Sequence, residues 1–207
     1  MFKRFALSLS LAVAVPAAAQ DAAPPATDRV VLETSLGDIT LEIETARAPV
    51  TAANFLRYVD EHRFDGTVFY RAMRLDWGQQ PNGLIQGGTQ MDPKRVLPPI
   101  AHEPTSQTGI RNTAGAISMA RYAPGTATGD FSIMVSDQPG LDADPNGQTD
   151  DARAGFAAFG HVVAGMDVVR KIFDQPTDPD KGDGWLKGQM LAQPVAIVHA
   201  HRVAKAR

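Results

Sequence analysis

Two histidines near the C-terminal end of the chain could bind a metal ion. His199 and His201 are separated by one residue, so on a strand both side chains project from the same face. A zinc site in a protein needs three or four side-chain ligands, and no further ligand stands near these two in the sequence. His62, His102 and His161 have no paired partner in the sequence either. We therefore expect no metal centre and interpret the histidines as surface or structural residues.

The segment Asp142–Asp151, with the sequence DADPNGQTDD, is a second candidate for metal binding. Its Asp and Asn residues stand at positions one, three, five and nine of a calcium-binding loop, and Gly147 stands at the sharp turn. Position twelve is Arg153, where such a loop needs a bidentate Glu. The alternative is a solvated turn rich in Asp, Asn and Gly, and the sequence leaves both interpretations open.

The composition excludes several other kinds of site. The chain has no cysteine, which rules out a disulfide framework, a thiol nucleophile and an iron–sulfur cluster. Neither the Gly-x-Ser-x-Gly motif of serine hydrolases nor the His-Glu-x-x-His motif of zinc proteases occurs. With Lys+Arg 20 against Asp+Glu 23, a net charge of −3, the sequence has no basic region suited to nucleic acid. We expect a protein without a cofactor and without a nucleic-acid partner.

Residues 1–19 have the features of a secretory signal peptide. A positively charged start precedes an apolar stretch, which ends in the small residues Ala17–Ala19. The alternative, an uncleaved membrane anchor, is disfavoured because the apolar run is shorter than the about 20 residues of a bilayer span. Residues 20–28, rich in alanine and proline, are interpreted as a flexible tether. We expect a periplasmic or secreted protein without a membrane span, folded as one domain over residues 29–205.

Periodicity and turn residues predict the elements that must position any functional side chain. Alternating apolar and polar residues predict a β-hairpin from Arg29–Ser35 and Asp38–Glu44. A helix is predicted over Val50–His62, with Thr51 available near its start, and a second helix over Met166–Asp174. The apolar residues of the first helix that recur at helical spacing are Val50, Ala53, Phe55, Leu56 and Val59.

Six further short β segments are predicted between clusters of Gly, Pro and Asp. They are Thr67–Ala72, Leu84–Gly88, Ala116–Met119, Phe131–Val135, Phe159–Val163 and Val195–Val203. With the hairpin they make eight short strands, which favour a closed barrel, and helices near its two ends can cap it. Residues at strand and helix periods mostly pack in a core, and the phenylalanines interpreted in this way are Phe55, Phe69, Phe131, Phe159 and Phe173.

Several short motifs occur in the order and spacing of one known family. They are Ala48-Pro49-Val50, Asn54-Phe55, Phe69-Tyr70-Arg71, Ile85-Gln86-Gly87-Gly88, Arg111-Asn112-Thr113, Ser118-Met119-Ala120, Leu141-Asp142 and Phe159-Gly160-His161-Val162-Val163. On these motifs the sequence resembles the cyclophilins, the peptidyl-prolyl cis–trans isomerase family, and especially their single-domain periplasmic bacterial branch. The resemblance implies an all-β dominated fold, a closed eight-stranded antiparallel β-barrel capped by two α-helices.

The resemblance also implies a function, the rotation of X–Pro bonds, whose barrier is about 18–20 kcal/mol. It places Arg71 as the catalytic group. A guanidinium beside the prolyl nitrogen stabilises the twisted state more than the planar one, and it stays protonated. The residues to which the resemblance gives a substrate-binding role are Phe69, Leu84, Gln86, Arg121, Asp130, Phe131, Ser132, Leu141 and Phe156. The implied partners are proline-containing unfolded or extended polypeptides, bound by a monomer.

The sequence departs from the family pattern around the expected proline pocket. Ser132 and Gly83 stand where the family has aromatic residues. Each buried large apolar side chain is worth about 1.5–3 kcal/mol, so losing two of them weakens contact with a proline ring. Trp77 or Tyr122 could fill the gap.

Asp130 is a further departure, because it replaces a Gln of the family pattern and can pair with Arg71 or Arg121. A paired Arg71 is less free to meet a substrate. Two functions therefore stay open: a foldase that isomerises X–Pro bonds, or a peptide-binding chaperone on the same scaffold with little catalysis. A hydrolase is set aside because the motifs of that class are absent.

Overall fold

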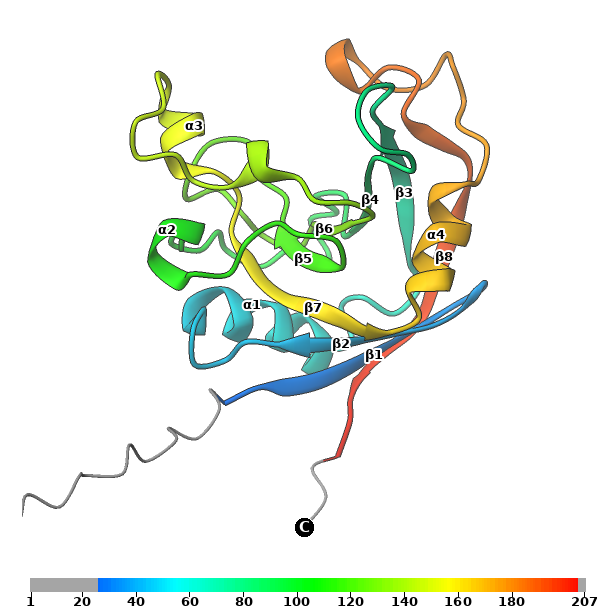
Figure 1. Cartoon of the computed structure of the whole chain (residues 1–207). Helices are drawn as coiled ribbons and strands as arrows, with labels where there is room; N and C mark the ends of the chain where they lie inside the picture. Colours follow the sequence, from blue (N-terminus) through cyan, green and yellow to red (C-terminus); the bar gives the residue numbers. More distant parts are fainter. Residues whose placement is uncertain (1–25, 205–207) are drawn as a thin grey trace, which may run out of the picture.

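The strands of the computed structural model form a closed barrel, in which all neighbouring strands are antiparallel (Figure 1). The structure describes residues 26–204, so the expected signal peptide, residues 1–19, lies outside the described residues. The order around the barrel is β1-β2-β7-β5-β6-β4-β3-β8. The strands are β1 (Asp28–Thr34), β2 (Gly37–Ile43), β3 (Thr67–Arg74), β4 (Gly83–Gly88), β5 (Ala116–Met119), β6 (Phe131–Met134), β7 (Ala158–Ala164) and β8 (Met190–Arg202). The predicted eight-stranded barrel is confirmed.

Five strand starts differ from the prediction, four of them by a single residue and that of β8 by more. β8 begins at Met190 rather than at Val195, and Pro194 lies in a stretch where the pairing of β8 with β3 is irregular, so its missing N–H costs no ladder bond. β1 begins at Asp28, and the carbonyl of Ala26 accepts the backbone N–H of Ala46 over 3.1 Å. The described end of the expected tether is therefore tied to the barrel.

The two predicted helices are present, and each covers a different part of the barrel. Helix α1 (Pro49–Asp60) contacts β7 and β8, whereas α4 (Met166–Phe173) contacts β2, β3 and β4. Two shorter helices were not predicted, α2 (Thr105–Thr108) and α3 (Asp150–Ala154), because four or five residues are too few to show helical periodicity. Two 3₁₀ turns were not predicted for the same reason. They are η1 (Pro139–Leu141) and η2 (Gly184–Leu186).

A group of aromatic rings lies within the core, among more numerous aliphatic side chains. The ring centroid of Phe55, on α1, lies 5.1 Å from that of Phe64, 5.4 Å from Phe131 and 5.2 Å from Phe159. Tilted and edge-on pairs of this kind contribute about 0.5–1.5 kcal/mol beyond burial. The five phenylalanines predicted as core are confirmed, since each is at most 4% exposed.

Helix α1 is capped from a distance rather than by its own residues. The carboxylate of Glu103 accepts the backbone N–H of Thr51 over 2.7 Å and its hydroxyl over 2.6 Å, so Thr51 is buried and does not cap the helix. Of the predicted apolar face, Val50 and Ala53 are exposed and the other three residues are buried. The helix is therefore oriented by Glu103 as well as by its apolar residues.

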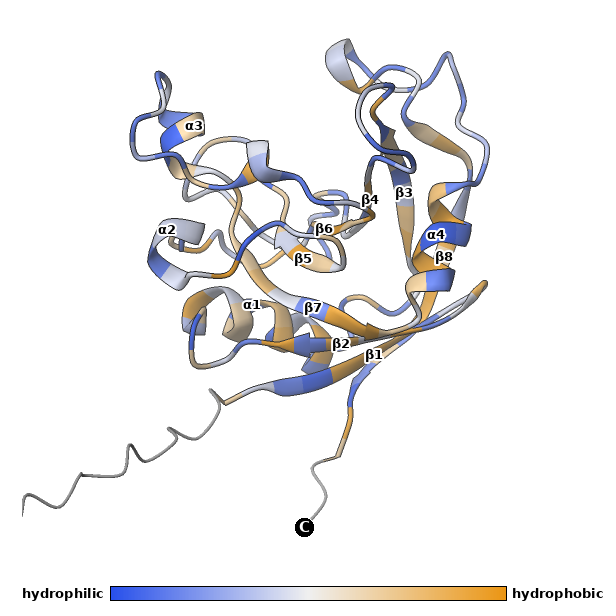
Figure 2. Cartoon of the chain, viewed as in Figure 1, coloured by the Kyte–Doolittle hydropathy of each residue, from blue (hydrophilic) through white to orange (hydrophobic). Residues whose placement is uncertain are grey.

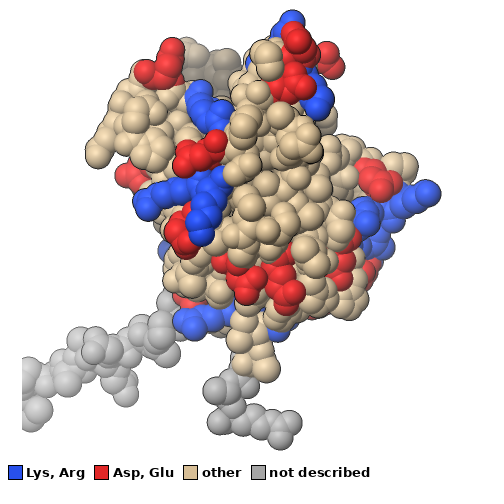
Figure 3. All heavy atoms as spheres, turned by 90° about the vertical axis from the view of Figure 1, so that its right-hand side faces the viewer, with Lys and Arg blue, Asp and Glu red and all other residues tan. Residues whose placement is uncertain are grey.

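The surface shows no large area of a single charge on the face seen in Figure 3, where acidic and basic side chains are interspersed. Hydrophobic residues concentrate on the strands, and the loops around η2 are mostly hydrophilic (Figure 2). Within residues 26–204, no helix is long and apolar enough to cross a membrane.

Candidate active site

Four polar side chains form a row on the outer face of the sheet made by β3, β4, β6 and β5. In the strand register Arg71 pairs with Gln86, Gln86 with Ser132, and Ser132 with Ser118. Directly paired residues of antiparallel strands project their side chains from the same face. Phe131, the neighbour of Ser132, is buried in the main core, so these four residues, the Arg71 row, face away from it.

A β-bulge at Tyr70 sets the direction of Arg71. The register shifts between Phe69 and Arg71 in the pairing of β3 with both β4 and β8. Neighbouring residues of a regular strand project to opposite faces, yet Tyr70 and Arg71 both reach Gln86. Arg71 Nη1 donates to Gln86 Oε1 over 2.6 Å, and Gln86 Nε2 donates to the Tyr70 hydroxyl over 2.7 Å. The extra residue brings both side chains to the same amide.

The remaining surroundings of Arg71 come from the segment that precedes β8. Gln189 Oε1 accepts Arg71 Nε over 2.9 Å and Nη2 over 2.6 Å, and the indole ring of Trp185 lies 4.7 Å from Arg71 Cζ. Gln189 is held in turn, because its Nε2 donates to the carbonyl of Trp185 over 2.7 Å. Figure 1 shows this segment beside the end of β3. Sequence reasoning missed both residues, since they are more than a hundred positions from Arg71.

Arg71 is a buried cation whose hydrogen-bond acceptors are neutral. Its residue exposure is 5%, and burial lowers its pKa to about 10, so the guanidinium stays protonated at neutral pH. Its acceptors, Gln86 and Gln189, are amide oxygens. Within residues 26–204 no carboxylate is bonded to Arg71. Its positive charge is therefore not neutralised and can act on a ligand bound at the row.

Asp130 stands behind the row and touches neither arginine. It accepts a backbone N–H over 2.8 Å and the hydroxyl of Tyr70, and burial raises the pKa of both Asp130 and Tyr70. The contact with Arg71 is therefore indirect, through Tyr70 and Gln86. The hypothesis that Asp130 pairs with Arg71 or Arg121 is wrong, because Tyr70 and backbone groups occupy its oxygens.

A small apolar cluster adjoins the Arg71 row on the same face. Leu84, Ala116 and Met134 form a buried group apart from the main core, and Met73 and Leu141 pack against it. Four members of this cluster lie on strands, each two positions from a residue of the Arg71 row, which is a distance of about 6–7 Å. They are Met73, Leu84, Ala116 and Met134. An apolar ring bound beside Arg71 can rest on this cluster. The sequence indicated Leu84 and Leu141 but neither methionine.

The backbone at Gly83 explains why no aromatic residue stands there. Its φ is +145°, a conformation that side-chain-bearing residues rarely adopt, and an added Cβ would lie 1.9 Å from the carbonyl oxygen of Met73. The backbone N–H of Gly83 donates to Ser136 Oγ over 3.1 Å, which fixes the residue at the start of β4. Leu84 and Met134 supply the apolar surface instead.

This geometry can be compared with that of known proteins. Residues 29–202 match the family described as cyclophilin type peptidyl-prolyl cis-trans isomerase/CLD. The chain belongs to this family. A peptidyl-prolyl cis-trans isomerase of Acinetobacter baylyi is 40% identical over 156 residues, which cover 73% of this chain and 75% of that protein. Peptidyl-prolyl cis-trans isomerase A of Dickeya dadantii is 35% identical over 182 residues, 86% of this chain and 88% of that protein.

Solved structures agree with the fold. A cyclophilin type peptidyl-prolyl cis-trans isomerase of Cryptosporidium parvum has a TM-score of 0.66 and 19% identity, covering 87% of this chain and 100% of that one. A second structure of that protein, in the presence of the dipeptide Ala-Pro, has the same TM-score and covers 86% of this chain and 99% of that one. The likeness shows the cyclophilin fold. Family and relatives together make the chain a peptidyl-prolyl cis–trans isomerase, as the sequence predicts.

In this cyclophilin Arg121 has a structural role. Its side chain is 1% exposed, donates to Asp151 Oδ1 over 2.7 Å and to the carbonyl of Gly155 over 2.6 Å, and lies 4.5 Å above the ring of Phe156. The prediction that Arg121 binds substrate directly is not met, because the fold occupies its donors. Phe156 is half-buried, and its backbone N–H donates to the carbonyl of Leu141 over 2.8 Å, which holds it beside Leu141 while Arg121 packs on its ring.

Two other predicted binding residues face the barrel interior of this cyclophilin. Phe69 and Phe131 are fully buried, and their ring centroids lie 5.8 Å apart edge-on. Both belong to the core, as periodicity indicated, and not to the Arg71 row. Trp77 and Tyr122, considered as fillers of the pocket, are 64% and 83% exposed, so neither closes it. The aromatic ring that stacks on the guanidinium of Arg71 is that of Trp185.

The acidic segment Asp142–Asp151 uses its carboxylates for structure. Asp142 Oδ1 accepts the backbone N–H of Asn112 over 2.8 Å, Asp144 Oδ1 accepts that of Asn146 over 2.9 Å, and Asp150 pairs with Arg153. Within residues 26–204 no group of three metal ligands gathers in this segment. The solvated-turn interpretation accounts for these contacts.

Proposed function

We propose that this protein isomerises X–Pro bonds in unfolded or extended polypeptides outside the cytoplasm, with Arg71 as the catalytic group. The observation that carries the proposal is the neutral surroundings of a buried guanidinium. Arg71 is oriented by amide oxygens and keeps its charge. As the prolyl nitrogen becomes pyramidal, its lone pair can accept from this guanidinium, which stabilises the twisted state above the planar ground state.

The residues around Arg71 divide the remaining work. The apolar cluster of Leu84, Met134 and Leu141 offers a floor for the prolyl ring. Phe156, whose ring packs against Arg121, is hydrogen-bonded to Leu141 of this floor. Gln86 holds Arg71 with its oxygen and lies at the half-exposed part of the row, where it can meet the substrate backbone. The Cryptosporidium parvum neighbour was solved in the presence of Ala-Pro, which supports an X–Pro ligand for this fold.

Arg71→Ala tests the catalytic assignment. Exchange on short X–Pro peptides is measured by NMR over a panel of X residues, with wild type, Arg71→Ala and the control Arg170→Ala, whose arginine is exposed on α4. We expect acceleration by wild type and by the control, and a loss of about 10²–10³-fold in Arg71→Ala, the cost of removing one preorganised donor. Unchanged exchange in Arg71→Ala overturns the role of Arg71.

The second candidate is a peptide-binding chaperone with little catalysis. It is favoured by the side chains that pack over the guanidinium of Arg71. Trp185 and Gln189 both contact the guanidinium, and Ser132 and Gly83 remove two aromatic walls. In the same experiment this candidate predicts peptide resonances that shift on binding while exchange stays at the uncatalysed rate of tens of seconds.

The proposal that the protein lies outside the cytoplasm and belongs to the periplasmic branch of the family depends on residues 1–19. We also propose that it is a monomer. Cell fractionation and the mass of the purified protein test the address. Cleavage after residue 19, with the protein in the periplasm or medium, is the expected result, and an uncleaved chain in the cytoplasm contradicts it. Light scattering should give the mass of one chain.

A further inference from the structure

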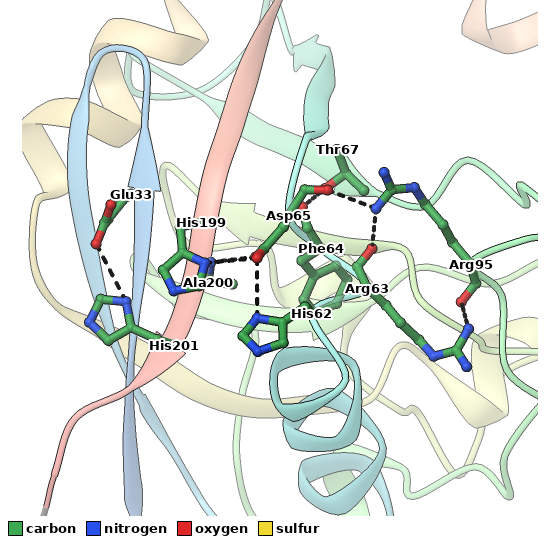
Figure 4. A network of polar contacts seen from close by, with 10 residues as sticks. All are labelled: Glu33, His62, Arg63, Phe64, Asp65, Thr67, Arg95, His199, Ala200 and His201. Carbon is green, nitrogen blue, oxygen red and sulfur yellow. Dashed lines mark hydrogen bonds and ion pairs between the residues drawn. The ribbon is translucent and has the colours of Figure 1, made fainter.

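Three polar side chains from two distant parts of the sequence meet on the surface away from the Arg71 row (Figure 4). Asp65 Oδ2 lies 3.2 Å from His62 Nδ1 and 2.8 Å from His199 Nδ1. One ligand atom from each residue lies within 4.8 Å of the others. The sequence gives no sign of this group, because Asp65, in the turn between α1 and β3, is 134 residues away from His199.

The carboxylate between the two rings is already held in place. Asp65 Oδ1 accepts the backbone N–H of Ala200 over 2.9 Å, which leaves Oδ2 facing the histidines. The turn itself is tied down, since Arg95 Nη1 donates to the carbonyl of Asp65 over 2.7 Å. His62 has a φ of 55° just after the end of α1, and its ring contacts Asp65. In metal sites, hydrogen bonds of this kind between the ligand residues and the surrounding protein hold the ligands in orientation.

We propose that His62, Asp65 and His199 bind a divalent late first-row transition metal ion such as Zn²⁺. Ligand atoms about 2.0–2.2 Å from a tetrahedral ion lie about 3.3 Å from one another, close to the separations seen between Asp65 and each ring. Two imidazoles and one carboxylate suit Zn²⁺, Cu²⁺, Ni²⁺ or Co²⁺, whereas Ca²⁺ and Mg²⁺ prefer oxygen ligands alone. Water completes the coordination.

The rings are accessible and can adjust around an ion. The exposed fraction of the side chain is 66% for His62 and 38% for His199, against 28% for Asp65. His201 stacks on His199 with ring centroids 5.3 Å apart, but its Nδ1 lies 3.5 Å from Glu33, so it belongs to a separate pair. A bound ion would join the α1–β3 turn to β8, the last strand of the barrel.

Titration of the metal-free protein with ZnCl₂, followed by calorimetry, tests the site. The variants are His199→Ala and His62→Asn, the latter because Asn tolerates a positive φ, whereas Asp65 is kept because it also binds Ala200. The control is His161→Ala, an exposed histidine 3.8 Å from a single carboxylate, that of Glu42. Far-UV circular dichroism checks that each variant is folded.

We expect one Zn²⁺ per chain, with the dissociation constant raised at least about tenfold in each variant and unchanged in the control. Imidazole NMR signals of His62 and His199 should shift together on saturation, and the melting temperature should rise with Zn²⁺ in wild type only. No binding by wild type overturns the proposal. Binding that both variants retain also overturns it, because the ion then sits elsewhere, for example at Asp142–Asp151.

Discussion

Arg71 and Arg121 are both buried guanidinium groups beside an aromatic ring, but they meet different acceptors. Arg71 Cζ lies 4.7 Å from the ring of Trp185, and Arg121 Cζ lies 4.5 Å from that of Phe156. The hydrogen bonds of Arg71 go to side-chain amides. Those of Arg121 go to backbone carbonyls and to a carboxylate, that of Asp151.

The difference shows which arginine can act on a ligand. The charge of Arg121 is balanced by Asp151, and its donors join the segment around α3 to the barrel. Arg71 is oriented without being neutralised, although burial makes its charge costly and lowers its pKa. A fold that keeps a buried cation without an acid beside it gives up stability at that point, which is common at functional sites.

Gln86→Glu removes the difference between the two arginines, because it gives Arg71 a carboxylate partner like that of Arg121. The new oxygen would stand where Arg71 Nη1 now donates over 2.6 Å. We expect kcat/KM for X–Pro exchange, measured by NMR, to fall about 10- to 100-fold as the charge is neutralised. The midpoint of urea unfolding should not fall, because a paired guanidinium is less costly to bury.

Gln189→Glu is the matched control for this variant. It places the same carboxylate at Nε and Nη2 of Arg71, on the other side of the guanidinium. A similar loss in both variants supports neutralisation of the charge. A loss in Gln86→Glu alone means that Gln86 acts by contacting the substrate.

Arg121→Ala should affect stability rather than chemistry. The side chain is 1% exposed, and its removal leaves the carbonyl of Gly155 without its donor. Bonds to charged groups are worth about 1.5–3 kcal/mol, so we expect the free energy of unfolding to fall by about 2 kcal/mol. Urea denaturation measures this. The folded variant should keep kcat/KM within a few-fold of wild type, and a larger loss would mean that Arg121 meets the substrate after all.

The pH dependence of activity tests the charge of Arg71 without a substitution. The pKa of Arg71 is about 10, so this cation loses its proton as the pH rises through that value. We expect kcat/KM to be flat between about pH 6 and 9 and to fall about tenfold for each further unit above 10. NMR exchange with an uncatalysed reference at each pH measures this. Constant kcat/KM up to pH 11 would contradict the lowered pKa.

The sequence predicted the barrel well, because strand periodicity and turn residues are local signals. All eight strands lie where alternation and Gly or Pro clusters placed them, within a few residues. The main error is the start of β8, which begins at Met190 rather than at Val195, and the irregular pairing with β3 there tolerates Pro194. The helices of four and five residues carry no periodic signal.

The site was predicted only in part, because its remaining parts arise from long-range contacts. Arg71 and Gln86 follow from motifs, and the register places them side by side. The role of Gly83 depends on its backbone φ, which a missing aromatic residue does not reveal. Trp185 and Gln189 reach Arg71 through the pairing of β8 with β3, and a tryptophan in a Gly- and Asp-rich loop gives no sign of its partner.

Trp185→Ala should have the smallest effect of these variants, and it tests how the contact of Trp185 with Arg71 affects catalysis. The indole is 73% exposed and lies over one face of Arg71, a cation–π contact worth about 0.5–1 kcal/mol at exposed sites. We expect kcat/KM to fall about threefold as the guanidinium loses its orientation. The control Trp77→Ala, which removes another exposed tryptophan, should leave kcat/KM unchanged. NMR exchange measures both. A rise in kcat/KM would show instead that the indole competes with substrate, and the cover over Arg71 would then be a restraint on catalysis.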